Sequence, residues 1–240
     1  RIYQINLAIA GIAIGVVILP QLSKHMKAKR KDKISLIQNK ALELSLFLSL
    51  PAAAALLIGS EEIISALFGY GSFDEFSVLN SSKALYYFAL GLPAFSLIKV
   101  FSSFFFANHD TKVPFYISLI SVLVNIVISI SYFSEIGFII IPIATTISSW
   151  LNALLLFIFL KNKNLFSFNN IFLINLIKIS GASILMALFF NFLITYFQKE
   201  LAFDQNIKSF YLILTVVLSL LFYLIISYLI KAFKMNDFKL

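Results

Sequence analysis

Three polar side chains of this chain lie inside long apolar segments, where polar groups are costly and commonly functional. Arg1 and Gln4 are one helical turn apart on the same predicted face, and Lys99 lies about nine residues inside another segment. A guanidinium beside an amide offers a planar set of donors that can bind phosphate oxygens at two points. Lys99 would lie ~13 Å deep, farther than a lysine stem comfortably reaches to the surface. We therefore expect a site for an anionic group, with interfacial anchoring as the alternative role for Arg1.

Other polar residues within the apolar segments favour structural roles. Lys178 lies near a segment end, where it would extend its ammonium to the membrane surface. Glu43 is similarly shallow, and Lys40, one turn away, is its expected partner. A last group is more typical of helix packing than of ligand binding: Asn125, Thr145, Thr146, Ser148, Ser149 and Asn152.

Signatures of catalysis and of metal binding are missing from the sequence. No pair of carboxylates at membrane depth could act as acid and base, and no Gly-rich phosphate loop is present. The chain has no cysteine, and its two histidines, His25 and His109, fall in separate loops. We therefore predict that the protein is not an enzyme and needs neither a metal ion nor another cofactor.

The elements that must position these residues are seven long apolar segments, each near the ~20 residues that cross a bilayer core. With 60% hydrophobic and 12% charged residues, the chain has too many apolar side chains for a water-soluble core. We predict an all-α, polytopic membrane protein of about seven transmembrane helices. The segments are 2–19, 41–58, 84–107, 113–132, 138–160, 171–197 and 209–230.

Basic residues fall mainly into every second connection between these segments. The connections 20–40, 108–112, 161–170 and the tail from Lys231 hold 13 of the 19 basic residues, whereas the alternate connections hold only Lys83, Lys199 and Lys208. This bias predicts that the first set and the C-terminus face the cytosol. The net charge of +8 is explained by topology and anionic lipid headgroups, so we expect membrane lipids and no nucleic acid as partners.

Several connections carry local signals. Residues 20–40 read as a cytosolic linker, following a first segment that ends at Pro20, with Ile34, Leu36 and Ile37 able to lie on the headgroups. Ser60 followed by two glutamates predicts a short helix at the outer membrane surface. Kinks are predicted inside two segments, at Gly91 and Pro93 in one and at Pro142 in another. Such kinks are tolerated where neighbouring helices or water satisfy the carbonyls that lose their helical donors.

The beginning of the chain predicts that it is part of a larger, transporter-like protein. The sequence starts at Arg1 without a methionine, within an apolar segment that has a basic residue at its outer end. The segments RIYQINLAIAGIAIGVVILPQLSK, ALFGYGSF and LIKVFSSFFFANHDTKVPF, together with the spacing of the spans, resemble the second half of the MurJ/MviN family of lipid II flippases. This family lies in the multidrug/oligosaccharidyl-lipid/polysaccharide exporter superfamily.

The resemblance implies a fold of two six-helix lobes around a central cavity, plus two extra C-terminal helices. Residues 1–160 would belong to the second lobe, and residues 161–240 would hold the extra helices and a cytosolic tail. Arg1, Gln4 and Lys99 would contact the substrate, which in this family is the diphosphate lipid that carries the peptidoglycan precursor. The first lobe, with further cavity arginines, would be missing from this chain.

The function that follows from the resemblance is the flipping of lipid II across the bacterial cytoplasmic (inner) membrane. A cationic cavity would hold the headgroup while the two lobes give alternating access. Two alternatives remain: an exporter of another polyprenyl-linked oligosaccharide, and a membrane scaffold without transport. A cavity lined by Arg1 and Lys99 would favour transport, whereas side chains facing lipid or paired with acids would favour the scaffold.

Overall fold

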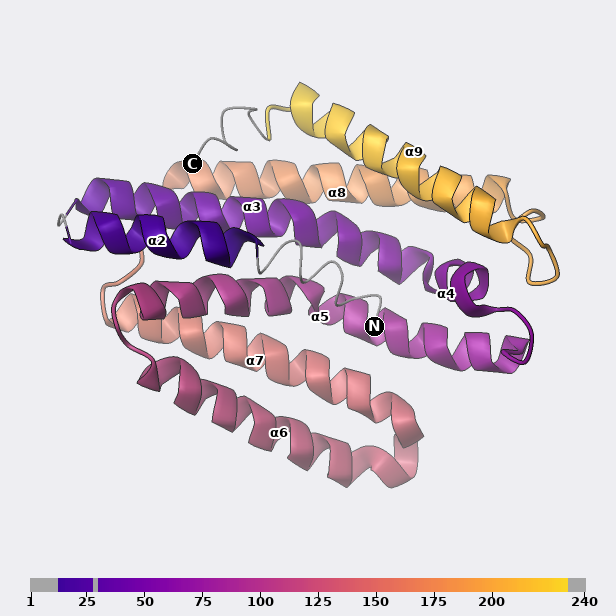
Figure 1. Ribbon diagram of the computed structural model, residues 1–240, viewed down its shortest axis with the longest axis horizontal. Helices are drawn as coiled ribbons and strands as arrows, with labels where there is room; N and C mark the ends of the chain where they lie inside the picture. Colours follow the sequence, from indigo (N-terminus) through magenta and orange to yellow (C-terminus); the bar gives the residue numbers. More distant parts are fainter. Residues whose placement is uncertain (1–12, 28–29, 233–240) are drawn as a thin grey trace.

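The computed structural model describes residues 13–27 and 30–232, and every regular element within these ranges is a helix (Figure 1). The predicted all-α fold is therefore confirmed. In chain order the elements are α2 (Ala13–Lys27), α3 (Lys31–Ile58), α4 (Ser60–Phe68), α5 (Glu75–Ala107), α6 (Lys112–Ile136), the 3-10 turn η2 (Gly137–Ile139), α7 (Ile140–Asn162), α8 (Asn170–Tyr196) and α9 (Lys208–Leu229).

Five stretches of the described chain are long and apolar enough to cross a membrane. The longest, Lys112–Asn162, has 51 residues and folds back at η2 into the antiparallel helices α6 and α7 (Figure 1). Gly137 in this turn has a φ of 72°, which a residue with a side chain rarely adopts. The protein is thus a multi-pass membrane protein. The predicted first span, 2–19, is described only from Ala13 onward.

Some helix ends differ from the sequence-based boundaries. α2 continues through Pro20 to Lys27, and α3 begins at Lys31, so the predicted linker 20–40 is wrong over most of its length. The boundaries had been placed where the sequence turns polar, but helical hydrogen bonding continues past that point. Ile37 consequently lies in the core rather than on a lipid surface.

The start of α5 shows the same effect. The helix begins at Glu75 instead of residue 84, because the Asp74 side chain accepts a hydrogen bond from the Ser77 amide at 2.8 Å and caps its first turn. The predicted short helix after Ser60 is confirmed as α4.

Successive long helices run in alternating directions (Figure 1). The end of α2 and the α5–α6 and α7–α8 connections gather at one end of the bundle, toward which α9 runs, whereas α4, the α6–α7 turn and the α8–α9 connection lie toward the other. The connections predicted to share a side of the membrane are therefore together in space. The end that faces the cytosol remains a prediction.

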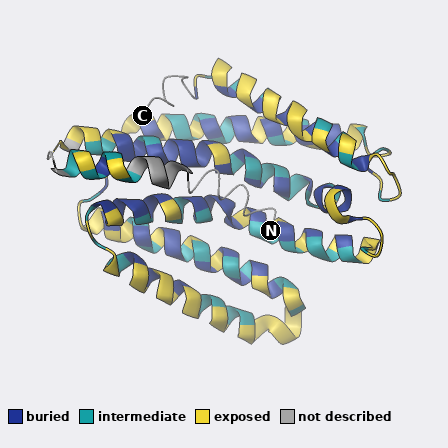
Figure 2. Ribbon diagram, in the orientation of Figure 1, coloured by how far each residue is buried: buried dark blue, intermediate teal, exposed yellow. Residues whose placement is uncertain are grey.

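The centre of the bundle is formed by α3 and α5. α3 packs against α2, α5 and α8, while α5 also packs against α4 and α7. Most of α6, by contrast, is exposed and contacts α7, with only Pro114, Ile117 and Ser121 buried along its length (Figure 2). The apolar outer face of α6 suits a lipid environment rather than water.

Pro51 interrupts the hydrogen bonding of α3, and α9 compensates. A proline has no amide hydrogen, so the carbonyl of Phe47, four residues earlier, loses its usual donor. The buried Tyr223 hydroxyl of α9 donates to this carbonyl at 2.8 Å, and the two rings pack with their centroids 5.0 Å apart. α9 is thereby fixed to α3 at the interruption.

Side chains of α7 donate to two carbonyls of α5 close to Pro93. Thr146 donates through Oγ1 to the Tyr87 carbonyl at 2.7 Å, and the Trp150 indole donates to the Leu90 carbonyl at 3.0 Å. Gly91 permits this approach, since a Cβ there would lie 2.9 Å from the Thr146 oxygen. Pro93 itself removes the helical donor of the Ala89 carbonyl, so the expectation that a neighbouring helix satisfies the freed carbonyl stays a prediction.

A buried lysine joins α4 to the start of α9. Lys208 is 1% exposed, and its ammonium donates to the carbonyls of Gly69 at 2.7 Å and Phe203 at 2.6 Å. The same nitrogen lies 4.4 Å from the ring centres of both Tyr70 and Phe203. A positive charge at the C-terminal end of α4 is also favoured by the helix dipole. We call this arrangement the Lys208 junction.

Candidate functional site

Of the three predicted site residues, the structure places only Lys99. Arg1 and Gln4 lie outside the described residues. Lys99 is on α5, eight residues before the helix ends at Ala107, and its side chain is exposed at the surface of the bundle. In the described part of the chain, no hydrogen bond or ion pair engages this ammonium. It therefore remains available to an anionic partner, ~12 Å from the end of its helix.

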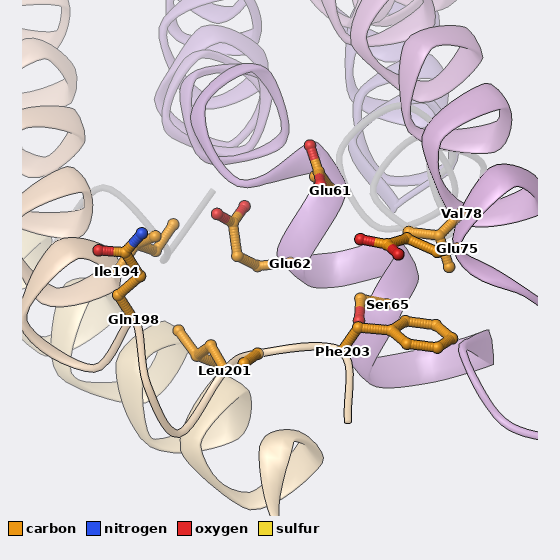
Figure 3. A pocket seen from close by; sticks show the side chains of 10 residues that line it. Glu61, Glu62, Ser65, Glu75, Val78, Ile194, Gln198, Leu201 and Phe203 are labelled. Carbon is orange, nitrogen blue, oxygen red and sulfur yellow. The ribbon is translucent and has the colours of Figure 1, made fainter. Parts of the chain in front are cut away.

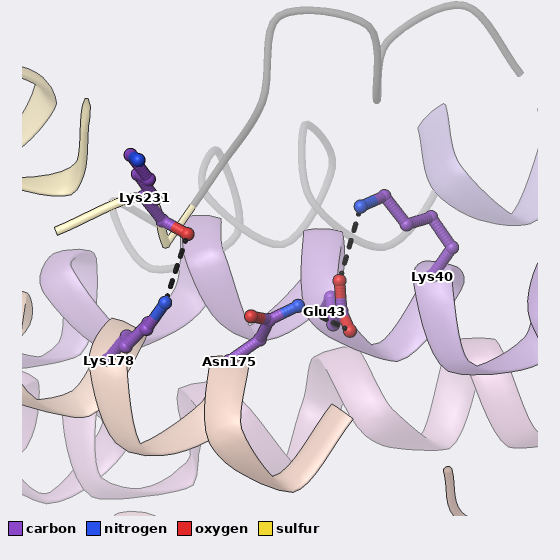
Figure 4. Close-up of polar contacts among 5 residues, drawn as sticks. All are labelled: Lys40, Glu43, Asn175, Lys178 and Lys231. Carbon is purple, nitrogen blue, oxygen red and sulfur yellow. Dashed lines mark hydrogen bonds and ion pairs between the residues drawn. The ribbon is translucent and has the colours of Figure 1, made fainter. Parts of the chain in front are cut away.

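Glu43 and Lys178, the other two charged residues singled out within the apolar segments, contact side chains or carbonyls of this chain (Figure 4). Glu43 accepts hydrogen bonds from Lys40 at 3.3 Å and from the Asn175 amide at 3.1 Å, which links α3 to α8. The predicted Lys40–Glu43 pair is confirmed. Lys178 donates to the carbonyl of Lys231 at 3.5 Å, beyond the end of α9. These contacts support packing roles and distinguish Lys178 from Lys99.

The polar residues of α6 and α7 bond to each other and to backbone carbonyls. The Asn125 amide donates to Thr145 Oγ1 at 3.2 Å and to Ser148 Oγ at 3.4 Å, across the two helices. Thr145 and Ser149 also donate to carbonyls within α7. This pattern agrees with the expected packing role of these residues.

An apolar hollow of about 210 Å³ lies among α3, α5, α7 and α8. Its walls include Leu46, Phe101, Trp150 and Phe172, and no polar surface lines it. Such a hollow can accept a hydrocarbon chain but offers nothing to a charged headgroup.

Sequence reasoning missed the Lys208 junction. Lys208 had been assigned to a connection because it stands at the polar edge of its apolar segment. Its carbonyl partner on Gly69 is 139 residues away in the chain, so no local pattern indicates the contact. The one signal available was a lysine directly preceding an apolar run.

Comparisons of the sequence with known proteins all find lipid II flippases named MurJ. The sequence profile of the family described as lipid II flippase MurJ matches residues 1–216. A probable lipid II flippase MurJ of Rhizobium meliloti is 42% identical over 157 residues, which are 65% of this chain and 29% of that protein. The lipid II flippase MurJ of Burkholderia cenocepacia is 27% identical over 187 residues, which are 78% of this chain and 36% of that protein.

The fold has a close counterpart among solved structures. A structure titled "Lipid II flippase MurJ, inward closed conformation" superposes with a TM-score of 0.76 and 26% sequence identity. The match covers 95% of this chain and 45% of the solved chain. This chain thus spans less than half the length of the proteins to which it is similar. The names of these proteins denote transport of a lipid rather than enzymatic catalysis.

Proposed function

This chain belongs to the lipid II flippase MurJ family, and from that membership we propose that it forms the second lobe and the two additional C-terminal helices of a lipid II flippase. The observation that carries the proposal is the family match over residues 1–216, together with a fold match over 95% of the chain. Residues 1–160 contribute the lobe, and residues 161–240 contribute the two helices and a cytosolic tail.

The physical task explains why a protein is needed. Sugars and a diphosphate cannot cross ~30 Å of hydrocarbon without a large desolvation cost. A cationic, water-filled cavity between two lobes holds the headgroup while the lipid tail stays in the bilayer. Rocking of the lobes then exposes the cavity to each side in turn. The missing N-terminal lobe is therefore a required partner of this chain.

Arg1, Gln4 and Lys99 are the proposed substrate contacts in this half of the cavity. Support for Lys99 comes from its depth on α5 and from its exposed side chain, which no described residue engages. Arg1 and Gln4 rest on the sequence alone, through the matched spacing of a guanidinium and an amide. The proposed location is the bacterial inner membrane, with the C-terminus in the cytosol.

Rescue of cells depleted of their own flippase tests the site in the full-length protein. Arg1→Ala should abolish rescue, and Arg1→Lys should restore it only in part, because a point charge lacks the planar fork. Lys99→Ala should reduce the rate of lipid II flipping in vesicles about tenfold, as expected for one lost charge-assisted hydrogen bond. Lys178→Ala is the matched control and should leave the rate unchanged, since Lys178 contacts a carbonyl of its own chain.

Immunoblots of the membrane fraction separate misfolding from lost activity. Normal growth of the Arg1→Ala strain at a normal protein level would remove Arg1 from the site. Membrane insertion at a normal level without any flipping of lipid II by the wild-type protein would favour the scaffold alternative instead.

Orientation is tested separately by single-cysteine labelling in a full-length protein whose remaining part is made free of cysteine; these 240 residues contain none. Ser72→Cys, in the connection before α5, should react with an impermeant thiol reagent in intact cells, whereas Asp237→Cys should not. Ser72 is chosen because the neighbouring Asp74 caps α5. The opposite labelling pattern would overturn the predicted topology.

A further inference from the structure

An acidic pocket of about 280 Å³ opens where α4, the start of α5 and the α8–α9 connection meet (Figure 3). Glu61 and Glu62 come from α4, and Glu75 comes from the first turn of α5. In Figure 3 Glu62 and Glu75 lie on either side of α4, and Glu61 projects from the beginning of the same helix; Glu61 and Glu75 are exposed, whereas Glu62 is half-buried. Within the described residues, no lysine or arginine forms an ion pair with any of them. The pocket therefore concentrates negative charge that its own walls do not neutralise.

A second observation points to a ligand with hydrogen-bond donors. Ser65, which lines the pocket, is only 5% exposed, and its Oγ has no hydrogen-bond partner among the described residues. A buried hydroxyl without a partner costs about 1–3 kcal/mol. Burial also raises the pKa of Glu62, an effect that its own backbone amide opposes and the charge of Glu61 reinforces. A bound cation with N–H donors would relieve both costs.

The geometry favours an organic cation over a metal ion. No group of three His, Cys, Asp or Glu side chains in the described chain is arranged to hold a metal. The volume of the pocket is several times that of one water molecule, which occupies about 30 Å³ in the liquid. A primary ammonium group has three donors and can reach separate oxygens across such a space.

The position of the pocket favours an amphiphile. It lies beside the ends of α8 and α9, whose outward side chains, such as Leu188 and Ile213, are apolar and exposed. Val78, Ile194 and Leu201 line part of the pocket and can cover the carbon atoms next to an ammonium. Lipid headgroups are concentrated at the end of a membrane helix, so even a weak site there is filled by lipid before a dilute solute.

We propose that this acidic pocket binds the primary ammonium group of a membrane lipid headgroup, with Glu62 and Glu75 as ion-pair partners and Ser65 Oγ as a hydrogen-bond acceptor. The bound lipid would hold α4 and the α8–α9 connection together. This site is distinct from the proposed substrate contacts at Arg1, Gln4 and Lys99, and it does not depend on lipid II flipping.

The first test needs no variant. The full-length protein is equilibrated with equal amounts of phosphatidylethanolamine and its mono-, di- and trimethylated derivatives, and retained lipids are counted by native mass spectrometry. Retention should fall stepwise as methyl groups replace N–H donors, by about tenfold from the primary amine to the trimethylated headgroup. Equal retention of all four lipids would overturn the proposal.

The second test asks whether the preference for the primary-amine headgroup arises in the acidic pocket. The Glu62→Gln/Glu75→Gln double variant should lose the preference, and Ser65→Ala should weaken it. Glu135→Gln is the matched control, since it removes one exposed carboxylate at the distant end of α6 and should leave the preference intact. Size-exclusion chromatography and circular dichroism confirm that the variants fold. A folded double variant that keeps the wild-type preference would also overturn the proposal.

Two competitors distinguish the lipid from other cations. Millimolar cadaverine, a soluble diamine, should displace little phosphatidylethanolamine, and millimolar Mg²⁺ should displace little as well. Full displacement by cadaverine would show that the pocket binds free amines without regard to lipid. Full displacement by Mg²⁺ would identify a divalent-cation site and refute the ammonium assignment.

Discussion

Replacing Lys208 by methionine should destabilise the protein by about 2–4 kcal/mol, through loss of the Lys208 junction. The ammonium makes two hydrogen bonds, to Gly69 O at 2.7 Å and Phe203 O at 2.6 Å, each worth about 1.5–3 kcal/mol for a charged donor. The contacts with the rings of Tyr70 and Phe203, both at 4.4 Å, add about 1–2 kcal/mol together. Returning the ammonium to water on unfolding recovers several kcal/mol, which offsets part of the sum. Methionine keeps the apolar stem contacts, so the variant isolates the charged group.

Thermal unfolding of the purified full-length protein in detergent measures the effect. The midpoint should fall, by less than the roughly 2–4 °C per kcal/mol typical of 150–250 residues, because the related proteins are more than twice as long as this chain. Lys208→Arg should lower the midpoint less than Lys208→Met does, because arginine keeps the positive charge. Lys199→Met removes the same charge from an exposed position in the same connection and should leave the midpoint unchanged.

Equal midpoints for Lys208→Met and Lys199→Met would refute the reasoning. That result would mean that the desolvation of the buried ammonium cancels its hydrogen bonds and ring contacts. The α4–α9 contact would then depend on its remaining bonds, among them the one between the Tyr70 and Ser209 hydroxyls at 2.7 Å.

Three further outcomes follow from other contacts. Tyr223→Phe should lower the free energy of unfolding by about 1–3 kcal/mol, because it removes the buried hydrogen bond from the Tyr223 hydroxyl to the Phe47 carbonyl, and an unchanged midpoint would show that this bond contributes nothing to stability. Gly91→Ala should lower the free energy of unfolding by about 1–3 kcal/mol, because its Cβ would displace Thr146 from its 2.7 Å bond. Adding Thr146→Val to this variant should then lower stability less than Thr146→Val does alone, because both changes remove the same hydrogen bond. The hydrogen bond from Lys163 lowers the pKa of Asp110, so this ion pair stabilises the folded protein by at most about 1 kcal/mol above the ordinary pKa of 3.8, and the stabilisation is lost as the pH falls below that value. Asp110→Asn should abolish this acid-sensitive part of the stability, and an unchanged pH profile of stability in the variant would contradict the assignment.

The helical type and the alternating directions of the long helices were predictable from the sequence because they depend on local composition. A run of ~20 apolar residues has few structural options in a bilayer, since each backbone polar group must be satisfied within the segment. The Lys40–Glu43 pair was predictable for a similar reason, as the two residues are three apart on one helix. The bond from Asn175 to Glu43 was not, because it joins α3 to α8.

The acidic pocket and the Lys208 junction escaped prediction for a shared physical reason. Glu61 and Glu62 were recognised only as the start of a short helix, because their position opposite the α8–α9 connection depends on how distant helices pack. Lys208 looked like an ordinary loop lysine, although the structure buries it against carbonyls of α4. Lys99 stood out in the sequence as a cation inside an apolar segment; the structure shows it exposed on α5, and its depth in the membrane and its assignment to a substrate site remain predictions.

The bond between Tyr223 and the Phe47 carbonyl has a consequence for how the chain is made. α3 leaves the ribosome long before α9, since the N-terminal part of a chain is synthesised first. Until α9 is synthesised and inserted, the hydrogen bond from the Tyr223 hydroxyl to the Phe47 carbonyl cannot form. We therefore expect chains truncated before Lys208 to pack incompletely and to be degraded readily by membrane proteases. The packing of α3 is thus completed only after α9 has been inserted.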